Sequence, residues 1–101
     1  MRRHRSDSNQ KEIIEALEAC GAFIVNLNQV GDGCPDLAVY LRGWHLVEVK
    51  TNSCWKYKPA QKKFNARCPV KIPIFTTVGE AVKWANTIRK AQRGIDWVAL
   101  R

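Results

Sequence analysis

The 101-residue sequence has no apolar run that approaches the ~18 residues needed to span a bilayer. Its charged first residues, Met1 to Arg5, are not followed by an apolar segment, so we predict no signal peptide and expect a cytoplasmic protein. Internal repeats and low-complexity segments are also lacking, and the length leaves room for a single core. We therefore predict one domain over residues 9–101, preceded by a basic arm over residues 1–8.

Clustered cysteine and histidine residues are absent as well. The four cysteines, at positions 20, 34, 54 and 68, form no C-x-x-C pair, and the chain has only two histidines. Because structural zinc sites usually take two ligands from one short turn, we expect no zinc. A disulfide framework is not expected without an export signal, so we predict reduced cysteines that are mostly buried.

Acidic residues are missing from residues 49–79, which carry seven Lys or Arg residues. The whole chain has 17 Lys and Arg against 9 Asp and Glu, a formal net charge of +8, and this excess favours a polyanionic partner such as nucleic acid. Trp55, Tyr57 and Phe64 lie among these cations, as is typical of surfaces that contact bases and phosphates together. The alternative is a solvated helix face. The predicted phosphate contacts are Lys56, Lys58, Lys62, Lys63 and Arg67.

Hydrophobic periodicity and turn residues predict a small α/β sandwich. We expect the first helix to be capped by Asn9 and Glu12 and to end at Gly21, and we expect Thr77 and Glu80 to cap the last helix. The expected elements are a helix over 9–20, strands over 22–27, 36–41 and 45–50, a helix over 59–65, a strand over 70–76, a helix from 78 to about 92, and a short strand over 95–100.

Two short motifs indicate a catalytic site. They are Gly33-Cys34-Pro35-Asp36-Leu37 and, twelve residues after the aspartate, Glu48-Val49-Lys50. With a three-residue turn at 42–44, Asp36 lies opposite Lys50 and Ala38 opposite Glu48, and all four side chains share one face of the sheet. Diagonal neighbours at roughly 7–8 Å allow the two carboxylates to share one divalent ion. A buried ion pair is the alternative, but two carboxylates with one lysine leave excess negative charge, which favours Mg²⁺.

These motifs resemble those of the PD-(D/E)xK nuclease superfamily, and most closely its VRR nuclease (VRR-NUC) group with its small stand-alone phage-type members. The resemblance covers about residues 7–91 and includes Gln61 on the second predicted helix. It implies a restriction-endonuclease-like three-layer sandwich, with a central mixed sheet of about 4–5 strands flanked by helices. Lys58 stands where family members often carry a Ser or Thr cap.

The resemblance also implies roles for individual residues. Asp36 and Glu48 are expected to bind the metal, with the Val49 carbonyl as a third protein ligand. Lys50 is expected to orient or deprotonate the attacking water, and Gln61 to close the site. Related nucleases place a further polar group on the first helix, and both Gln10 and Glu12 are candidates. Helical geometry aims Gln10 at the site and assigns Glu12 to the cap.

Together these features predict a Mg²⁺-dependent DNA endonuclease, with Mn²⁺ as a possible substitute. The alternative is a DNA- or RNA-binding module that keeps the fold but cuts little or nothing. We further expect a homodimer that acts on branched or Holliday-junction DNA. This expectation rests on Trp84 and Trp97, which lie outside the proposed site, and on the apolar residues 95–100. The alternative is that the two tryptophans complete the core of a single chain.

Overall fold

The computed structural model describes residues 6–94, and side chains over residues 9–91. The predicted strand at 95–100 and Trp97 lie outside the described residues. No helix among the described residues is long and apolar enough to cross a membrane. The elements in chain order are α1 (Ser6–Ala19), β1 (Phe23–Asn26), β2 (Leu37–Tyr40), β3 (Trp44–Val49), α2 (Pro59–Arg67), β4 (Ile74–Phe75) and α3 (Val78–Gly94).

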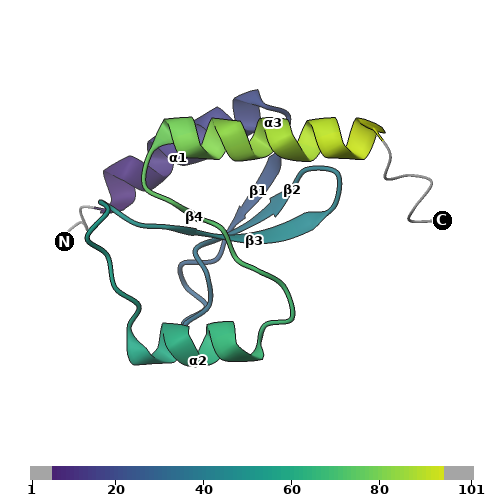
Figure 1. Cartoon of the computed structure of the whole chain (residues 1–101). Helices are drawn as coiled ribbons and strands as arrows, with labels where there is room; N and C mark the ends of the chain where they lie inside the picture. Colours follow the sequence, from purple (N-terminus) through teal and green to yellow (C-terminus); the bar gives the residue numbers. More distant parts are fainter. Residues whose placement is uncertain (1–5, 95–101) are drawn as a thin grey trace.

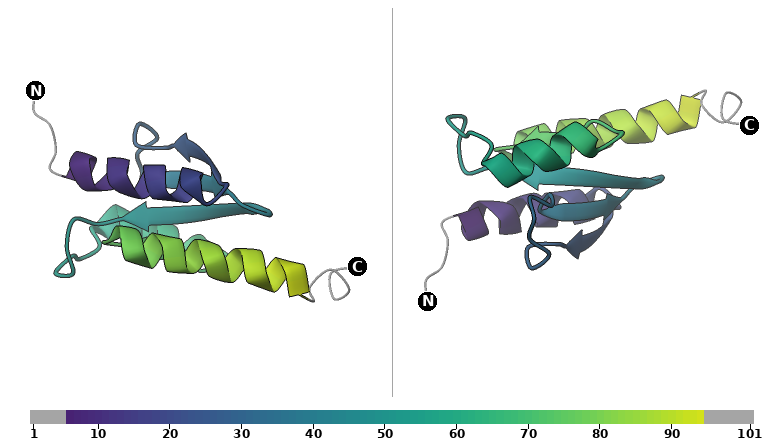
Figure 2. Two further views of the ribbon diagram at one scale, coloured as in Figure 1. Left: turned by 90° about the horizontal axis from the view of Figure 1, so that it is seen from above. Right: turned by 90° about the horizontal axis from the view of Figure 1, so that it is seen from below.

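The strands form one mixed sheet in the order β1-β2-β3-β4. The first three strands are antiparallel, and β4 runs parallel to β3. Helices α1 and α3 lie side by side over one face of the sheet, and α2 lies on the other side (Figures 1 and 2). This is the predicted three-layer α/β sandwich, with a restriction-endonuclease-like arrangement of sheet and helices.

The hydrophobic core lies between the sheet and the α1–α3 layer. Alternating residues of β2 and β3 point into it, as the period of two requires, and α1 contributes Ile13 and Leu17 with no exposed surface. The fully or nearly buried core residues are Ile13, Leu17, Leu37, Val39, Leu41, Val47, Val49, Phe75, Ala81 and Ala85. The opposite face of the same strands is therefore free to carry polar side chains beneath α2.

The β2–β3 hairpin differs from our prediction by a shift of two residues. The turn is formed by residues 41–43 rather than 42–44, and Tyr40 pairs with Trp44. Arg42 and Gly43 adopt positive φ angles of 59° and 135°, and the Leu41 amide bonds to the Gly43 carbonyl at 2.9 Å. These angles close the chain one residue earlier than we expected. Because a shift of two preserves the alternation, every side chain stays on its predicted face.

The predicted helix caps are partly wrong. Helix α1 begins at Ser6, so Asn9 and Glu12 lie within it and do not cap it. Gly21 ends this helix as predicted, with a φ of 98° that suits glycine. In α3 the Glu80 amide bonds to the Thr77 hydroxyl, as expected, and the Glu80 carboxylate also accepts from the Thr76 amide at 2.7 Å.

Two further expectations need correction. Trp84 packs edge-on against His45, with ring centroids 5.0 Å apart, and lies 5.6 Å from the Phe75 ring, so it completes the core of its own chain. The four cysteines form no disulfide, as predicted, but they are not mostly buried. Cys54 is exposed and the other three are half-buried, because they lie at element ends and in loops rather than on the core-facing positions.

Candidate active site

Asp36 immediately precedes β2, and Glu48 lies near the end of β3. The observed β2–β3 ladder ends at Leu37–Val47 and is shifted by two residues from our predicted register, which placed Asp36 opposite Lys50. The Asp36 carbonyl accepts from the Leu27 amide at 2.8 Å, which ties the start of β2 to the residue after β1. The two carboxylates lie close enough for the charge of Asp36 to raise the pKa of Glu48.

The main chain of Val49 lies beside the Asp36 carboxylate. Its amide donates to Asp36 Oδ2 at 2.9 Å, which fixes the orientation of that carboxylate. The family resemblance implies that the Val49 carbonyl is a third oxygen ligand, and this role stays a prediction.

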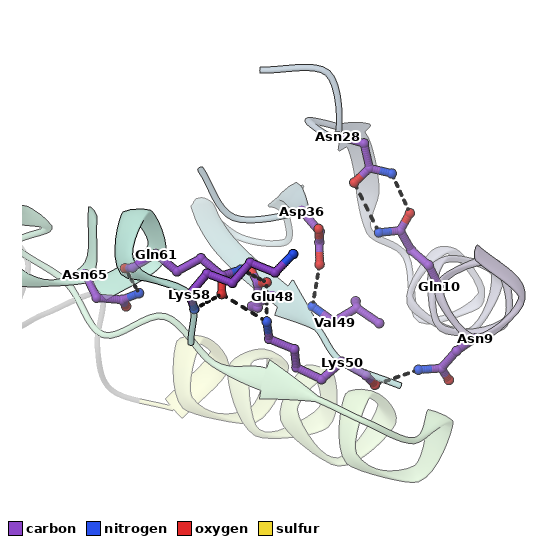
Figure 3. A network of polar contacts seen from close by, with 10 residues as sticks. All are labelled: Asn9, Gln10, Asn28, Asp36, Glu48, Val49, Lys50, Lys58, Gln61 and Asn65. Atoms are coloured by element: carbon purple, nitrogen blue, oxygen red, sulfur yellow. Dashed lines mark hydrogen bonds and ion pairs between the residues drawn. The ribbon is translucent and has the colours of Figure 1, made fainter. Parts of the chain in front are cut away.

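Lys50 follows on the same face as Glu48. Its Nζ lies 3.4 Å from Glu48 Oε2, and the lysine side chain is 15% exposed against 6% for the glutamate. Asn9 of α1 donates to the Lys50 carbonyl at 2.8 Å and thereby ties the end of β3 to the helical layer (Figure 3). Asn9 thus has a structural role near the site that its reading as a helix cap did not reveal.

Gln61 connects the carboxylate, the lysine and the start of α2. Its Nε2 donates to Glu48 Oε2 at 3.0 Å, while its Oε1 accepts from Lys50 Nζ at 3.2 Å (Figure 3). The same Oε1 accepts from the Lys58 amide at 2.9 Å. Gln61 therefore caps α2 through the Lys58 main chain, and the missing Ser or Thr cap at that position is compensated.

Gly33 lets α2 approach the loop that carries Asp36. Its φ is +78°, and a Cβ atom at this position would overlap the carbonyl group of Ala60 and the main-chain nitrogen of Gln61. The first residue of the G-x-P-D-L motif is thus the point at which the loop contacts the helix. The position of Gln61 over the carboxylates depends on this contact.

Burial and mutual repulsion disfavour the charged forms of the two carboxylates. Burial, and next the charge of Asp36, raise the pKa of Glu48 to about 7, although Lys50 acts in the opposite direction. Burial also raises the pKa of Asp36, against the Val49 amide and Lys50. One lysine does not neutralise two buried carboxylates, so the donor set fits a divalent cation with oxygen ligands. Over the part of the chain that is described, no three His, Cys, Asp or Glu side chains gather to hold a metal. The candidate ligands are therefore Asp36, Glu48 and the Val49 carbonyl.

The raised pKa of Glu48 predicts an unusual pH dependence of stability. The folded state binds the Glu48 proton more tightly than the unfolded chain, whose glutamate pKa is about 4.3. The free energy of unfolding of the metal-free protein should therefore fall as the pH rises through the window from about 4.5 to 7. Urea denaturation in EDTA across this window measures it. Glu48→Gln should show a weaker decline, and an equal decline in both proteins would contradict the assignment.

The candidates on the first helix do not contact the carboxylates. Gln10 is only 7% exposed, and its amide pairs reciprocally with Asn28, with Asn28 Nδ2 donating to Gln10 Oε1 at 2.9 Å. Figure 3 shows this pair beside Asp36 rather than bonded to it. Glu12 is exposed. Asn28 has no signal in the sequence, since its partner lies 18 residues away on another element.

The predicted phosphate contacts all lie on the α2 side of the molecule. Lys56 and Lys58 belong to the segment that leads into α2, and the other three lie on α2 itself. All five are exposed: Lys56, Lys58, Lys62, Lys63 and Arg67. The Arg67 guanidinium lies 5.7 Å from the centre of the Phe64 ring. The basic surface thus lies on the same side of the sheet as the carboxylates.

A solved structure described as a VRR_NUC domain is similar to this chain. The two structures superpose with a TM-score of 0.68 at 26% sequence identity, over 83% of this chain and 97% of that chain. No protein-family model and no curated protein matches the sequence. The likeness spans nearly the whole of the matched domain.

Proposed function

We propose that this chain, whose fold matches that of a VRR_NUC domain, is a divalent-metal-dependent DNA endonuclease. One observation carries the proposal: the carboxylates of Asp36 and Glu48 lie close together, and Lys50 and Gln61 both contact Glu48 Oε2. Two carboxylates and a lysine on one sheet face provide a place for a hard cation and a place for an attacking water.

Different residues of the chain would contribute different steps of phosphodiester hydrolysis. Asp36, Glu48 and the Val49 carbonyl would hold Mg²⁺ or Mn²⁺, which when bound polarises the scissile phosphate and lowers the pKa of a coordinated water. The Lys50 ammonium stabilises the negative charge that develops on the phosphate and orients the water. Gln61 holds Lys50 Nζ and Glu48 Oε2 at a fixed separation through its two amide atoms.

The test is a comparison of cleavage with Mg²⁺, with Mn²⁺ and with EDTA, on end-labelled linear duplex and four-way junction DNA. We expect cutting with either metal and none in EDTA. Cleavage that persists in EDTA would overturn the metal-dependent mechanism.

A second candidate function is DNA or RNA binding with little or no cleavage. It is favoured by Gln10, which stands on the first helix where related nucleases carry a Glu and which is engaged by Asn28. In this case the site has two carboxylates rather than three. DNA that is bound with the predicted salt dependence but remains intact with Mg²⁺ and Mn²⁺ would favour this function over the first.

We further propose that the nuclease acts as a homodimer on branched or junction DNA. Trp84 no longer supports a dimer, because it packs within its own chain. The support comes from apolar side chains exposed on the sheet: Phe23 (62%), Tyr40 (45%) and Trp44 (59%), whose rings contact one another. A twofold dimer presents two sites to symmetry-related strands, as a four-way junction requires. Light scattering should give twice the 11.5 kDa chain mass. A monomer mass, or equal cutting of linear duplex and junction, would contradict this proposal.

The basic surface of α2 leads to a prediction on binding. Replacing Lys62, Lys63 and Arg67 with alanine should weaken binding to all DNA sequences alike, because these residues would contact phosphates. The logarithm of the association constant decreases as the logarithm of the salt concentration rises. The magnitude of this slope should decrease by about 0.9 for each lost phosphate contact. Fluorescence anisotropy over a salt series measures this slope. Lys83→Ala, an exposed lysine of α3 on the opposite layer, is the control. An unchanged slope in the triple variant would show that α2 faces bulk solvent.

A further inference from the structure

Two aromatic rings form one wall of the candidate active site. Trp55 and Tyr57 lie in the segment between β3 and α2, and their ring centroids are 5.0 Å apart at an interplanar angle of 62°. Lys50 Nζ lies 6.0 Å from the centre of the Trp55 ring and 5.8 Å from that of Tyr57. The same ammonium is 3.4 Å from Glu48 Oε2. The rings therefore adjoin the position where the scissile phosphate would lie.

These rings do not belong to the hydrophobic core. The core lies on the other face of the sheet, and neither Trp55 nor Tyr57 is among the residues packed against it. Both are half-buried, whereas the neighbouring Lys56 and Lys58 are exposed. A tryptophan and a tyrosine that are partly exposed, outside the core and flanked by cations have no evident role in folding. Their placement is typical of a surface on which bases stack.

We propose that Trp55 and Tyr57 form a subsite for one unpaired nucleobase next to the scissile phosphodiester. This inference rests on the proposed nuclease function and adds a determinant of substrate choice to it. A base inside a duplex has both faces covered by its neighbours, so it cannot stack on a protein ring without being unpaired first. An unpaired base is free of this cost, and stacking on an aromatic ring tolerates any base identity.

The two lysines beside the rings complete the subsite. A nucleotide bound here would present its base to the rings and its phosphates to the exposed Lys56 and Lys58. Lys50 Nζ lies near both the Trp55 ring and Glu48 Oε2, so a base held by Trp55 would place its own phosphate near the proposed catalytic lysine. The subsite therefore favours cutting next to unpaired nucleotides, whatever their sequence.

The experiment compares binding to two duplexes that differ at one position. One carries a single bulged adenosine, and the other carries an abasic residue in its place, so that the phosphates are identical and only the base is missing. Binding is measured by fluorescence anisotropy in EDTA, without cleavage. We expect wild-type protein to bind the adenosine bulge about tenfold more tightly than the abasic bulge, as stacking of one base on an aromatic ring would give. Trp55→Ala and Tyr57→Ala should each reduce this ratio towards one.

Two controls separate stacking from other roles of the rings. Trp55→Phe keeps a ring and should retain most of the ratio, and Val78→Ala, an exposed apolar residue at the start of α3, should leave it unchanged. A ratio of one in the wild type would overturn the inference. It would also be overturned if Trp55→Ala kept the full ratio and only slowed cleavage of all substrates alike, since the rings would then merely position Lys50. Cleavage with Mg²⁺ but without a base-dependent ratio would reject this subsite and leave the proposed nuclease function standing.

Discussion

Alanine at Asp36, Glu48 or Lys50 is expected to lower DNA cleavage by roughly 10³-fold or more, since metal and lysine together supply several kcal/mol of transition-state stabilisation. DNA affinity should remain close to that of the wild type, because the exposed cations of α2 supply the attraction between protein and DNA. Single-turnover cleavage and anisotropy on the same junction measure the two quantities. Removing Asp36 or Glu48 relieves repulsion between buried carboxylates, so neither variant should lose its fold.

The matched control is Glu15→Ala, which removes an exposed carboxylate from α1 and should leave the rate unchanged. Robust cutting by any of the three site variants would exclude the corresponding residue from the site. Equal losses of affinity and of cleavage would instead show that these residues bind DNA in its ground state.

Gly33→Ala is expected to impair both stability and cleavage. The positive φ of +78° alone costs a residue with a Cβ about 1–3 kcal/mol. The added Cβ also overlaps the Ala60 carbonyl and the Gln61 nitrogen, so α2 must move away from the carboxylates. The bonds from Gln61 to Glu48 and Lys50 are then lost. Urea denaturation and the cleavage rate per folded molecule measure the two effects.

Gly31→Ala separates backbone strain from this displacement. Gly31 has nearly the same φ, +80°, but a Cβ there meets no atom within 4 Å. This variant should lose stability by a similar backbone cost and keep its cleavage rate per folded molecule. Equal cleavage by the Gly31 and Gly33 variants would show that the position of α2 does not matter for the site.

The face on which the site residues lie could be predicted from the sequence, because it depends only on alternation along two strands. Asp36, Glu48 and Lys50 are separated by even numbers of residues, and the hairpin keeps an odd number in its turn. The register of the β2–β3 hairpin could not be predicted. This register depends on which residue of the turn is the first to adopt a positive φ angle. That residue is Arg42, and an arginine gives no sequence signal for this angle.

Contacts between elements that are distant in the sequence could not be predicted, because local patterns carry no information on them. From local patterns we interpreted Asn9 as a helix cap and Trp84 as an interface residue. In the folded chain Asn9 donates to a carbonyl 41 residues away, and Trp84 packs against a histidine of β3. The pairing of Gln10 with Asn28 is similar, since a buried amide accepts any suitably placed polar partner. The placement of Gln61 in the first turn of α2 could be predicted, because Pro59 fixes the start of this helix, while its role in the site was implied only by the family resemblance.

The central claim is that Asp36 and Glu48 together hold one divalent cation. Anomalous diffraction from crystals of the wild-type protein grown with Mn²⁺ tests it most directly. We predict one Mn²⁺ between the two carboxylates, with the Val49 carbonyl among its oxygen ligands, and no such peak in crystals of Glu48→Gln. A Mn²⁺ ion bound elsewhere in the chain, with none between Asp36 and Glu48, would contradict the account.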